Sequence, residues 1–149
     1  EKIRQQLALL DTMIHQLNPT SYPWTFTTFD TYRVTLTLYG PGGSYDPEEG
    51  SILIYTTPTG QVKNYDDPAN TIIHEVVHIG LEQAIMVTLQ VPHPLKERIV
   101  DTFVSLHFGR YLPEYRIQNL GDTRSDPYLK SPADFSRLDQ IVARLLKQQ

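Results

Sequence analysis

Cysteine is absent from the 149 residues of the sequence. Disulfide bonds and thiolate metal sites are therefore excluded, and a metal site in this chain would have to use histidine and carboxylate side chains. Long hydrophobic runs are also missing, because no stretch approaches the roughly 18 consecutive apolar residues that a membrane-spanning helix needs. Basic residues are scattered and number 13, against 17 acidic ones. A net charge of −4 without a basic cluster argues against a nucleic-acid-binding protein.

The composition that remains is that of an ordinary globular domain. Apolar residues make up 40% of the chain and aromatic residues 10%, and the length is typical of one domain with its own core. We therefore expect a single domain over residues 1–149. No signal peptide is recognisable, and the chain starts at Glu1 rather than at a methionine, which is compatible with a mature form or with part of a longer protein. The cellular location stays open.

The first half of the chain predicts a helix followed by a small sheet. Apolar residues recur at helical spacing over residues 3–17, and Asn18-Pro19 is expected to end this helix. Residues 41–50, which are rich in glycine, proline and acidic residues, are expected to form a loop between strands. Apolar runs and apolar–polar alternation predict three strands, at residues 32–39, 51–57 and 61–65.

The second half of the chain predicts helices. Asp67-Pro68 suits a helix start, and the residues that follow are apolar on nearly all sides up to about residue 90, which is typical of a buried helix. Residues 94–108 form the next predicted helix. Residues 111–130 are expected to be irregular, and a capping-box pattern at 131–134 introduces a terminal amphipathic helix. Helices and a small antiparallel sheet in separate parts of the chain indicate an α+β fold.

One motif in the buried helix carries chemistry, namely His74-Glu75-Val76-Val77-His78. Histidines at positions i and i+4 lie on one face of a helix and can share one metal ion. Glu75 projects beside that ion, where a carboxylate can take a proton from an activated water. Imidazole and carboxylate groups are costly to bury without partners, and a metal ion would compensate them.

A catalytic zinc site needs a third protein ligand and an open fourth position. The candidates are Glu82, His93, Glu97, Asp101 and His107. Glu82 lies too far round and along the first helix to reach the same ion, so we expect it to be an indirect partner of the site or a solvated charge. Glu97 lies on the following helix, which a turn at residues 91–94 folds back against the first. Asp101 shares its face, so Glu97 can bind the metal while Asp101 accepts a hydrogen bond from a ligand histidine.

The motif His74-Glu75-x-x-His78, followed by the eighteen residues 79–96 and then by Glu97, resembles that of the gluzincins, the thermolysin-like and aminopeptidase-like zinc peptidases. The likeness covers roughly residues 50–110. It implies a zincin-like fold, in which the motif helix and a following ligand helix pack with a small sheet. The chain departs from the family in having Lys96 where an asparagine usually precedes the glutamate, and in being too short for the C-terminal lobe of larger members.

The resemblance implies a catalytic Zn²⁺ bound by His74, His78 and Glu97. It also implies that Asp101 orients His74 and that Glu75 is the general base for the water that attacks the substrate. The expected activity is hydrolysis of peptide bonds in a protein or peptide substrate. An inhibitory or regulatory protein partner is compatible with this expectation.

Two further parts of such an enzyme have candidates in the sequence. The oxyanion formed during hydrolysis needs a donor besides zinc, which family members supply as a tyrosine or histidine from the C-terminal part. The candidates are Tyr115, Tyr111, Tyr128 and His107, and we favour Tyr115 because it follows the ligand helix closely. In such peptidases an edge strand before the motif helix binds extended substrate, and residues 51–57 are the candidate unless they form an inner strand.

Two other functions stay open from the sequence. HExxH sites also serve deformylases and other amidases, so one alternative is a narrow-specificity zinc amidase or a toxin-type or regulatory metalloprotease with a single protein partner. The other is a catalytically silent, zinc-dependent binding module, which a fourth ligand from His93 or His107 would favour. Glu75 argues against the silent module, because a purely structural zinc site has no use for a glutamate at that position.

Overall fold

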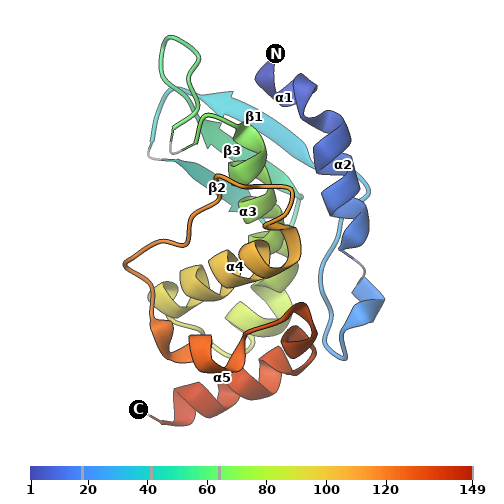
Figure 1. Ribbon diagram of the computed structural model, residues 1–149, viewed down its shortest axis with the longest axis vertical. Helices are drawn as coiled ribbons and strands as arrows, with labels where there is room; N and C mark the ends of the chain where they lie inside the picture. Colours follow the sequence, from blue (N-terminus) through green and yellow to red (C-terminus); the bar gives the residue numbers. More distant parts are fainter. Residues whose placement is uncertain (18, 41, 64, 149) are drawn as a thin grey trace.

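The computed structural model describes residues 1–17, 19–40, 42–63 and 65–148, and it combines a small sheet with several helices (Figure 1). The helices are α1 (Lys2–Gln5), α2 (Leu7–Gln16), α3 (Pro68–Leu81), α4 (His93–Phe108) and α5 (Leu138–Lys147). The strands are β1 (Arg33–Thr37), β2 (Gly43–Asp46) and β3 (Ser51–Tyr55). Shorter helical turns are η1 (Pro19–Ser21), the π-helical η2 (Glu82–Val87), η3 (Thr123–Tyr128) and η4 (Pro132–Arg137). The α+β class predicted from the sequence is therefore confirmed.

The sheet has the strand order β1-β3-β2 and is mixed rather than antiparallel. β1 and β3 run parallel, whereas β2 and β3 run antiparallel. The expectation of an antiparallel sheet is therefore wrong for one of the two strand pairs. The reason is the path of the chain, which leaves β1, forms the far edge as β2 and then returns between the two as β3.

β3 is the inner strand of the sheet, so the expectation that residues 51–57 bind substrate as an edge strand is wrong. Ile52 and Ile54 of β3 are buried against the helices, and both edges of the strand are already paired. Residues 51–57 therefore cannot bind a substrate by edge pairing. The edge strand beside α3 is β2, which lies within the predicted loop at residues 41–50. Its glycine and turn-forming residues carry no strand signal, and pairing with β3 outweighs their local preference.

The predicted third strand at residues 61–65 does not form as expected. A single bridge joins Val62 to Thr56 in this region, and Asn64 lies outside the described residues. Pro41 and Asn18, which belong to the predicted loop and helix stop, also lie outside them. The sheet is thus built from β1, β2 and β3 within the part of the chain that the structure describes.

α3 forms where the sequence predicts the buried helix. The side chain of Asp67 accepts a hydrogen bond of 2.9 Å from the Ala69 amide and caps the helix, and Pro68 occupies its first turn, where no amide donor is needed. The helical path continues through the π-helical turn η2. It stops at Gln90, which adopts a φ of 54°, and the amide of Val91 then donates back to the carbonyl of Met86 at 2.9 Å.

The terminal helices differ from prediction in detail. The helix predicted at residues 3–17 is interrupted at Gln6, which separates α1 from α2. The capping box is present, since the Asp134 carboxylate accepts a hydrogen bond of 2.9 Å from the Ser131 amide. This box starts the turn η4, and α5 follows it directly. The segment predicted to be irregular at residues 111–130 contains one short helical turn, η3.

α3 lies at the centre of the molecule, with the sheet on one side, α2 along another and α4 crossing it (Figure 1). Away from the sheet, the core is aromatic and contains the fully buried rings of Phe26, Phe103 and Phe135. A Cβ atom at Gly80 would overlap the Phe26 ring, so glycine is needed at that point of the helix. No helix in the described ranges is long and apolar enough to cross a membrane.

Candidate metal centre

Three side chains from α3 and α4 converge on one point. His74 and His78 lie one turn apart on α3, and Glu97 lies near the start of α4. The two histidine Nε2 atoms are 3.0 Å apart. Glu97 places Oε2 at 3.4 Å from His74 Nε2 and Oε1 at 3.1 Å from His78 Nε2. The structure therefore brings the three predicted ligands together as a group that could hold a metal ion.

The donor atoms have the spacing that a small divalent cation requires. Zinc binds histidine nitrogen and carboxylate oxygen at about 2.0–2.2 Å in a tetrahedral arrangement, which separates neighbouring donor atoms by about 3.3 Å. The two nitrogens lie 3.0 Å apart, and each also lies near this distance from a different oxygen of the Glu97 carboxylate, His74 from Oε2 at 3.4 Å and His78 from Oε1 at 3.1 Å. Two nitrogens and one carboxylate suit zinc, and three ligands leave one coordination position open.

The other ring nitrogen of His74 is held by a pair of side chains. Nδ1 lies 2.6 Å from the Tyr115 hydroxyl oxygen and 3.2 Å from Asp101 Oδ1. Burial alone would lower the pKa of His74, but the hydrogen bonds with Asp101 and Glu97 outweigh it and raise the pKa to about 10. The predicted contact between Asp101 and His74 is therefore present, with Tyr115 as an additional partner.

His78 has a different environment. Its side chain is 2% exposed, and its ring stacks on the Tyr45 ring with a centroid distance of 4.7 Å and an interplanar angle of 12°. Burial is the main cause that lowers the pKa of His78 to about 4, so the ring is neutral. Its buried Nδ1 has no hydrogen-bond partner in the part of the chain that the structure describes. The stack on Tyr45 and the contact of Nε2 with Glu97, rather than a hydrogen bond on Nδ1, therefore hold this ring.

Glu97 is ionised in this setting. Burial would raise the pKa of its carboxyl group, but hydrogen bonds from His74 and His78 outweigh burial and hold the pKa well below its usual range. His93 lies on the same face of α4, where its exposed ring places Nδ1 3.8 Å from Glu97 Oε1. This distance is too long for a hydrogen bond.

Glu75 lies beside the ligands against the edge strand. The residue is 5% exposed, and burial is the main cause that raises the pKa of its carboxyl group to about 7. A Cβ atom at Gly43 would lie 2.6 Å from Glu75 Oε1 and 2.8 Å from Thr71 Cγ2. A glycine on β2 therefore leaves room for the carboxylate that the sequence assigns as general base.

Glu82 does not belong to the group of candidate ligands but to a polar cluster with Tyr45 and Lys96. Its Oε2 accepts a hydrogen bond of 2.9 Å from the Tyr45 hydroxyl and lies 3.2 Å from Lys96 Nζ. The Lys96 ammonium also lies 5.1 Å from the centroid of the Tyr45 ring. The lysine that departs from the gluzincin pattern thus joins α4 to η2 and β2 through Glu82 and Tyr45.

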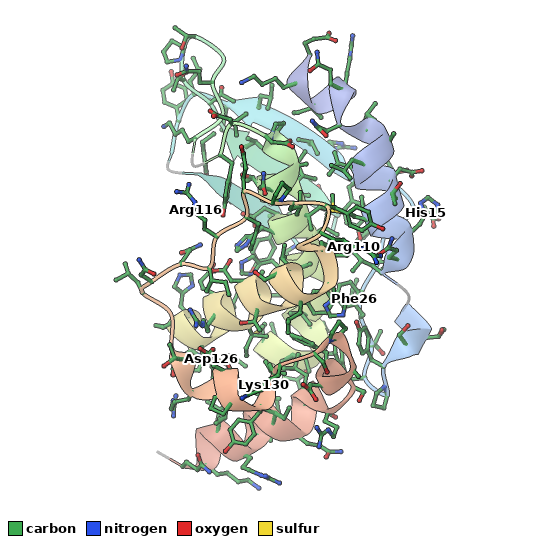
Figure 2. All side chains as sticks on the ribbon, viewed as in Figure 1. His15, Phe26, Arg110, Arg116, Asp126 and Lys130 are labelled. Atoms are coloured by element: carbon green, nitrogen blue, oxygen red, sulfur yellow. The ribbon has the colours of Figure 1, made fainter. Side chains whose placement is uncertain are left out.

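His74, His78 and Glu97 form part of the wall of an open cleft of about 830 Å³. β2 contributes one wall with Gly43, Ser44 and Tyr45, and residues 116–119 contribute another. Arg116 extends from this second segment toward the sheet (Figure 2).

The structure separates the candidates for the oxyanion donor. Tyr115 lies behind His74, on the ring nitrogen that faces away from the ligand group. Tyr111 accepts hydrogen bonds from Gln16 and Arg110 at the surface. His107 stacks on Phe103, and Tyr128 borders a different surface pocket. The aromatic or imidazole side chains that line the cleft besides the ligands are Tyr45, Tyr65 and His93.

Three contributors to the site escaped the sequence analysis. Gly43 and Tyr45 belong to a strand whose sequence resembles a loop, and Gln118 belongs to an irregular segment. The Gln118 amide donates a hydrogen bond of 2.9 Å to Asp101 Oδ2. The sequence offers a signal for Tyr45 alone, because aromatic side chains commonly line binding clefts.

Comparisons with protein families, with curated proteins and with solved structures find no match to this chain. A function must therefore be argued from the side chains of the site.

Proposed function

We propose that this chain is a zinc-dependent peptidase of the gluzincin type with a zincin-like catalytic domain. The observation that carries the proposal is the convergence of His74, His78 and Glu97, with donor separations of 3.0–3.4 Å, in an open cleft that also contains Glu75. A structural zinc site would use a fourth protein ligand. The candidates for such a ligand do not supply it, because His107 stacks on Phe103 and contacts Tyr22 outside the cleft, and His93 lies exposed at the rim.

Zinc, when bound by His74, His78 and Glu97, acts as a Lewis acid that acidifies water and polarises a carbonyl oxygen. The protonation state or the orientation of each proposed ligand suits metal binding. Glu97 is an ionised carboxylate, His78 is neutral, and His74 presents Nε2 to the group while Nδ1 is occupied by Tyr115 and Asp101. These are the protonation states and orientations that metal ligands require, once His74 has lost one proton.

Glu75 is suited to general acid–base catalysis. Its pKa of about 7 lies close to neutral pH, where one carboxyl group can accept a proton and later return it. In the proposed reaction Glu75 takes a proton from the attacking water and delivers it to the leaving amine. Gly43 supports this role by leaving the space that the carboxylate occupies.

The edge strand β2 is the proposed binding site for the substrate main chain. Among the described residues β2 pairs with β3 alone, and its residues Gly43, Ser44 and Tyr45 line the cleft beside the proposed ligands. An extended peptide can add to such an edge through main-chain hydrogen bonds. This assigns to β2 the role that the sequence analysis gave to residues 51–57. The oxyanion donor would come from the lining of the cleft, where His93 and Arg116 carry N–H groups.

The proposal is tested with a peptide library and mass-spectrometric detection of cleavage. The zinc-loaded protein should cleave peptides, and Glu75→Gln should retain zinc while losing turnover. Loss of zinc in Glu75→Gln would contradict its role as base. Zinc binding without cleavage of any peptide, in a protein that nevertheless binds one, would favour the silent binding module.

A further inference from the structure

The hydroxyl group of Tyr115 lies between a candidate zinc ligand and a buried carboxylate. Its oxygen is 2.6 Å from His74 Nδ1 and 2.7 Å from Asp101 Oδ1. The direct separation between His74 Nδ1 and Asp101 Oδ1 is longer, at 3.2 Å. The tyrosine ring is held by a parallel stack on Tyr65, with a centroid distance of 5.8 Å and an interplanar angle of 10°. The stack on the ring and the two contacts of the hydroxyl oxygen therefore hold the Tyr115 side chain in one position.

The number of protons decides the direction of these two hydrogen bonds. The hydroxyl of Tyr115 has a single proton, and it donates this proton to Asp101 Oδ1. The hydroxyl oxygen must then accept from His74, which places a proton on Nδ1. Nε2 is the nitrogen of the same ring that faces His78 and Glu97. A zinc ion at that position requires the Nε2 lone pair, and Tyr115 favours the tautomer that supplies it.

Asp101 also joins the ligand to the wall of the cleft. Its second oxygen, Oδ2, accepts a hydrogen bond of 2.9 Å from the Gln118 amide. Asp101 thereby holds the chain at Tyr115 and at Gln118. Residues 116–119, which include Gln118, line the cleft. The same pair of side chains thus orients a ligand and anchors a segment against which a substrate would lie.

We propose that Tyr115 is a positioning residue that holds His74 in the zinc-binding tautomer and ties it, through Asp101, to the segment at residues 115–118. This inference rests on the zinc site of the proposed function but not on peptidase activity. It replaces the expectation that Tyr115 stabilises the oxyanion, because its hydroxyl lies on the side of His74 away from the ligand group.

The substitution Tyr115→Phe tests this role, because it removes the hydroxyl and keeps the ring that stacks on Tyr65. We expect zinc to bind about 10–100-fold more weakly, the range typical of lost partners of ligand histidines. The affinity is measured by competition with a chromophoric zinc chelator. Tyr111→Phe is the matched control, because its hydroxyl also has two hydrogen-bond partners, Gln16 and Arg110, at the surface. The control should bind zinc as the unaltered chain does.

A second readout separates positioning from general destabilisation. In the zinc-loaded protein, the Nδ1 proton of His74 should give a slowly exchanging imidazole N–H signal in ¹H–¹⁵N NMR spectra. In zinc-loaded Tyr115→Phe this signal should shift or exchange faster, because only the longer contact to Asp101 remains. Tyr111→Phe should leave the signal in place.

The outcomes distinguish this inference from the function on which it rests. Equal zinc affinity and an unchanged His74 signal in Tyr115→Phe would overturn the positioning role and leave the zinc site intact. Failure of the unaltered chain to bind zinc would overturn both. Weaker zinc binding in Tyr115→Phe, in a chain that cleaves no peptide, would support the positioning role and contradict the peptidase.

Discussion

The ring of Tyr45, on the edge strand β2, stacks on the imidazole of His78, on helix α3, with ring planes 12° apart. This contact joins the strand that we propose to bind substrate to a ligand of the proposed zinc site. It also explains how His78 keeps its orientation, since its buried Nδ1 has no hydrogen-bond partner among the described residues. The two histidines are thus supported in different ways, His74 by hydrogen bonds on its edge and His78 by an aromatic face.

Substitutions at Tyr45 should separate the stack from the hydrogen bond. Tyr45→Phe keeps the ring and removes the hydrogen bond to Glu82, so we expect unchanged zinc affinity and a loss of about 1 kcal/mol in the free energy of unfolding. Tyr45→Leu also removes the stack, which is worth about 1 kcal/mol beyond its buried area, and should weaken zinc binding as well. Chelator competition and urea denaturation measure the two effects. Equal zinc affinity in both variants would show that the stack does not position His78.

Gly43→Ala should affect turnover far more than zinc binding. The added Cβ would meet Glu75 Oε1 at 2.6 Å, and the carboxylate is the part of the contact that can move. A displacement of a catalytic group by about 1 Å costs on the order of 100-fold in rate, while the ligands His74, His78 and Glu97 stay in place. The measurement is the cleavage rate of the zinc-loaded variant beside its zinc affinity. Gly43 has no positive φ, so the substitution adds the contacts with Glu75 and Thr71 without left-handed backbone strain. Unchanged turnover in Gly43→Ala would argue against Glu75 as the base.

Zinc binding should release a proton, and its affinity should rise with pH. His74 has a raised pKa of about 10, so below this pH it must lose one proton before its Nε2 can bind zinc. Glu75 and His78 have pKa values of about 7 and about 4, and both are deprotonated at pH 8.5. Between pH 8 and 9 the affinity should therefore increase by at least about tenfold per pH unit, with at least one proton released per zinc, because a zinc-bound water that ionises adds to the proton from His74.

Calorimetric titration at pH 8.5 in buffers of different ionisation enthalpy measures this proton. Asp101→Asn is the informative variant, because it removes the hydrogen bond that contributes most to raising the pKa of His74. The variant should release fewer protons per zinc than the unaltered chain at this pH. A heat of binding that does not depend on the buffer would contradict the raised pKa.

Local sequence patterns predicted the part of the site that lies on helices. The spacing of His74 and His78 places them on one helical face regardless of the rest of the fold. The position of Glu97 was predictable because the turn at residues 91–94 is short, so α4 must pack against α3. Asp101 was predictable with it, because both residues lie on the same face of α4. These predictions needed only helix geometry and one short connection.

The parts that depend on distant pairing were missed or misplaced. β2 forms because residues 43–46 pair with β3 and pack on α3, and neither contact has a local signal in a glycine-rich segment. The inner position of β3 follows from the path of β2 and could not be predicted without it. Tyr115 reaches His74 because an irregular segment returns across α4, so its proximity to the site was predicted and its position behind the ligand was not.

The central claim is that His74, His78 and Glu97 bind one zinc ion, and the zinc content of the purified protein tests it most directly. Elemental mass spectrometry of the unaltered chain and of His78→Ala, after reconstitution with zinc and removal of excess metal, gives the stoichiometry. The account predicts about one zinc per chain and its loss in His78→Ala. An unaltered chain without zinc, or a His78→Ala variant that retains it, would contradict the account.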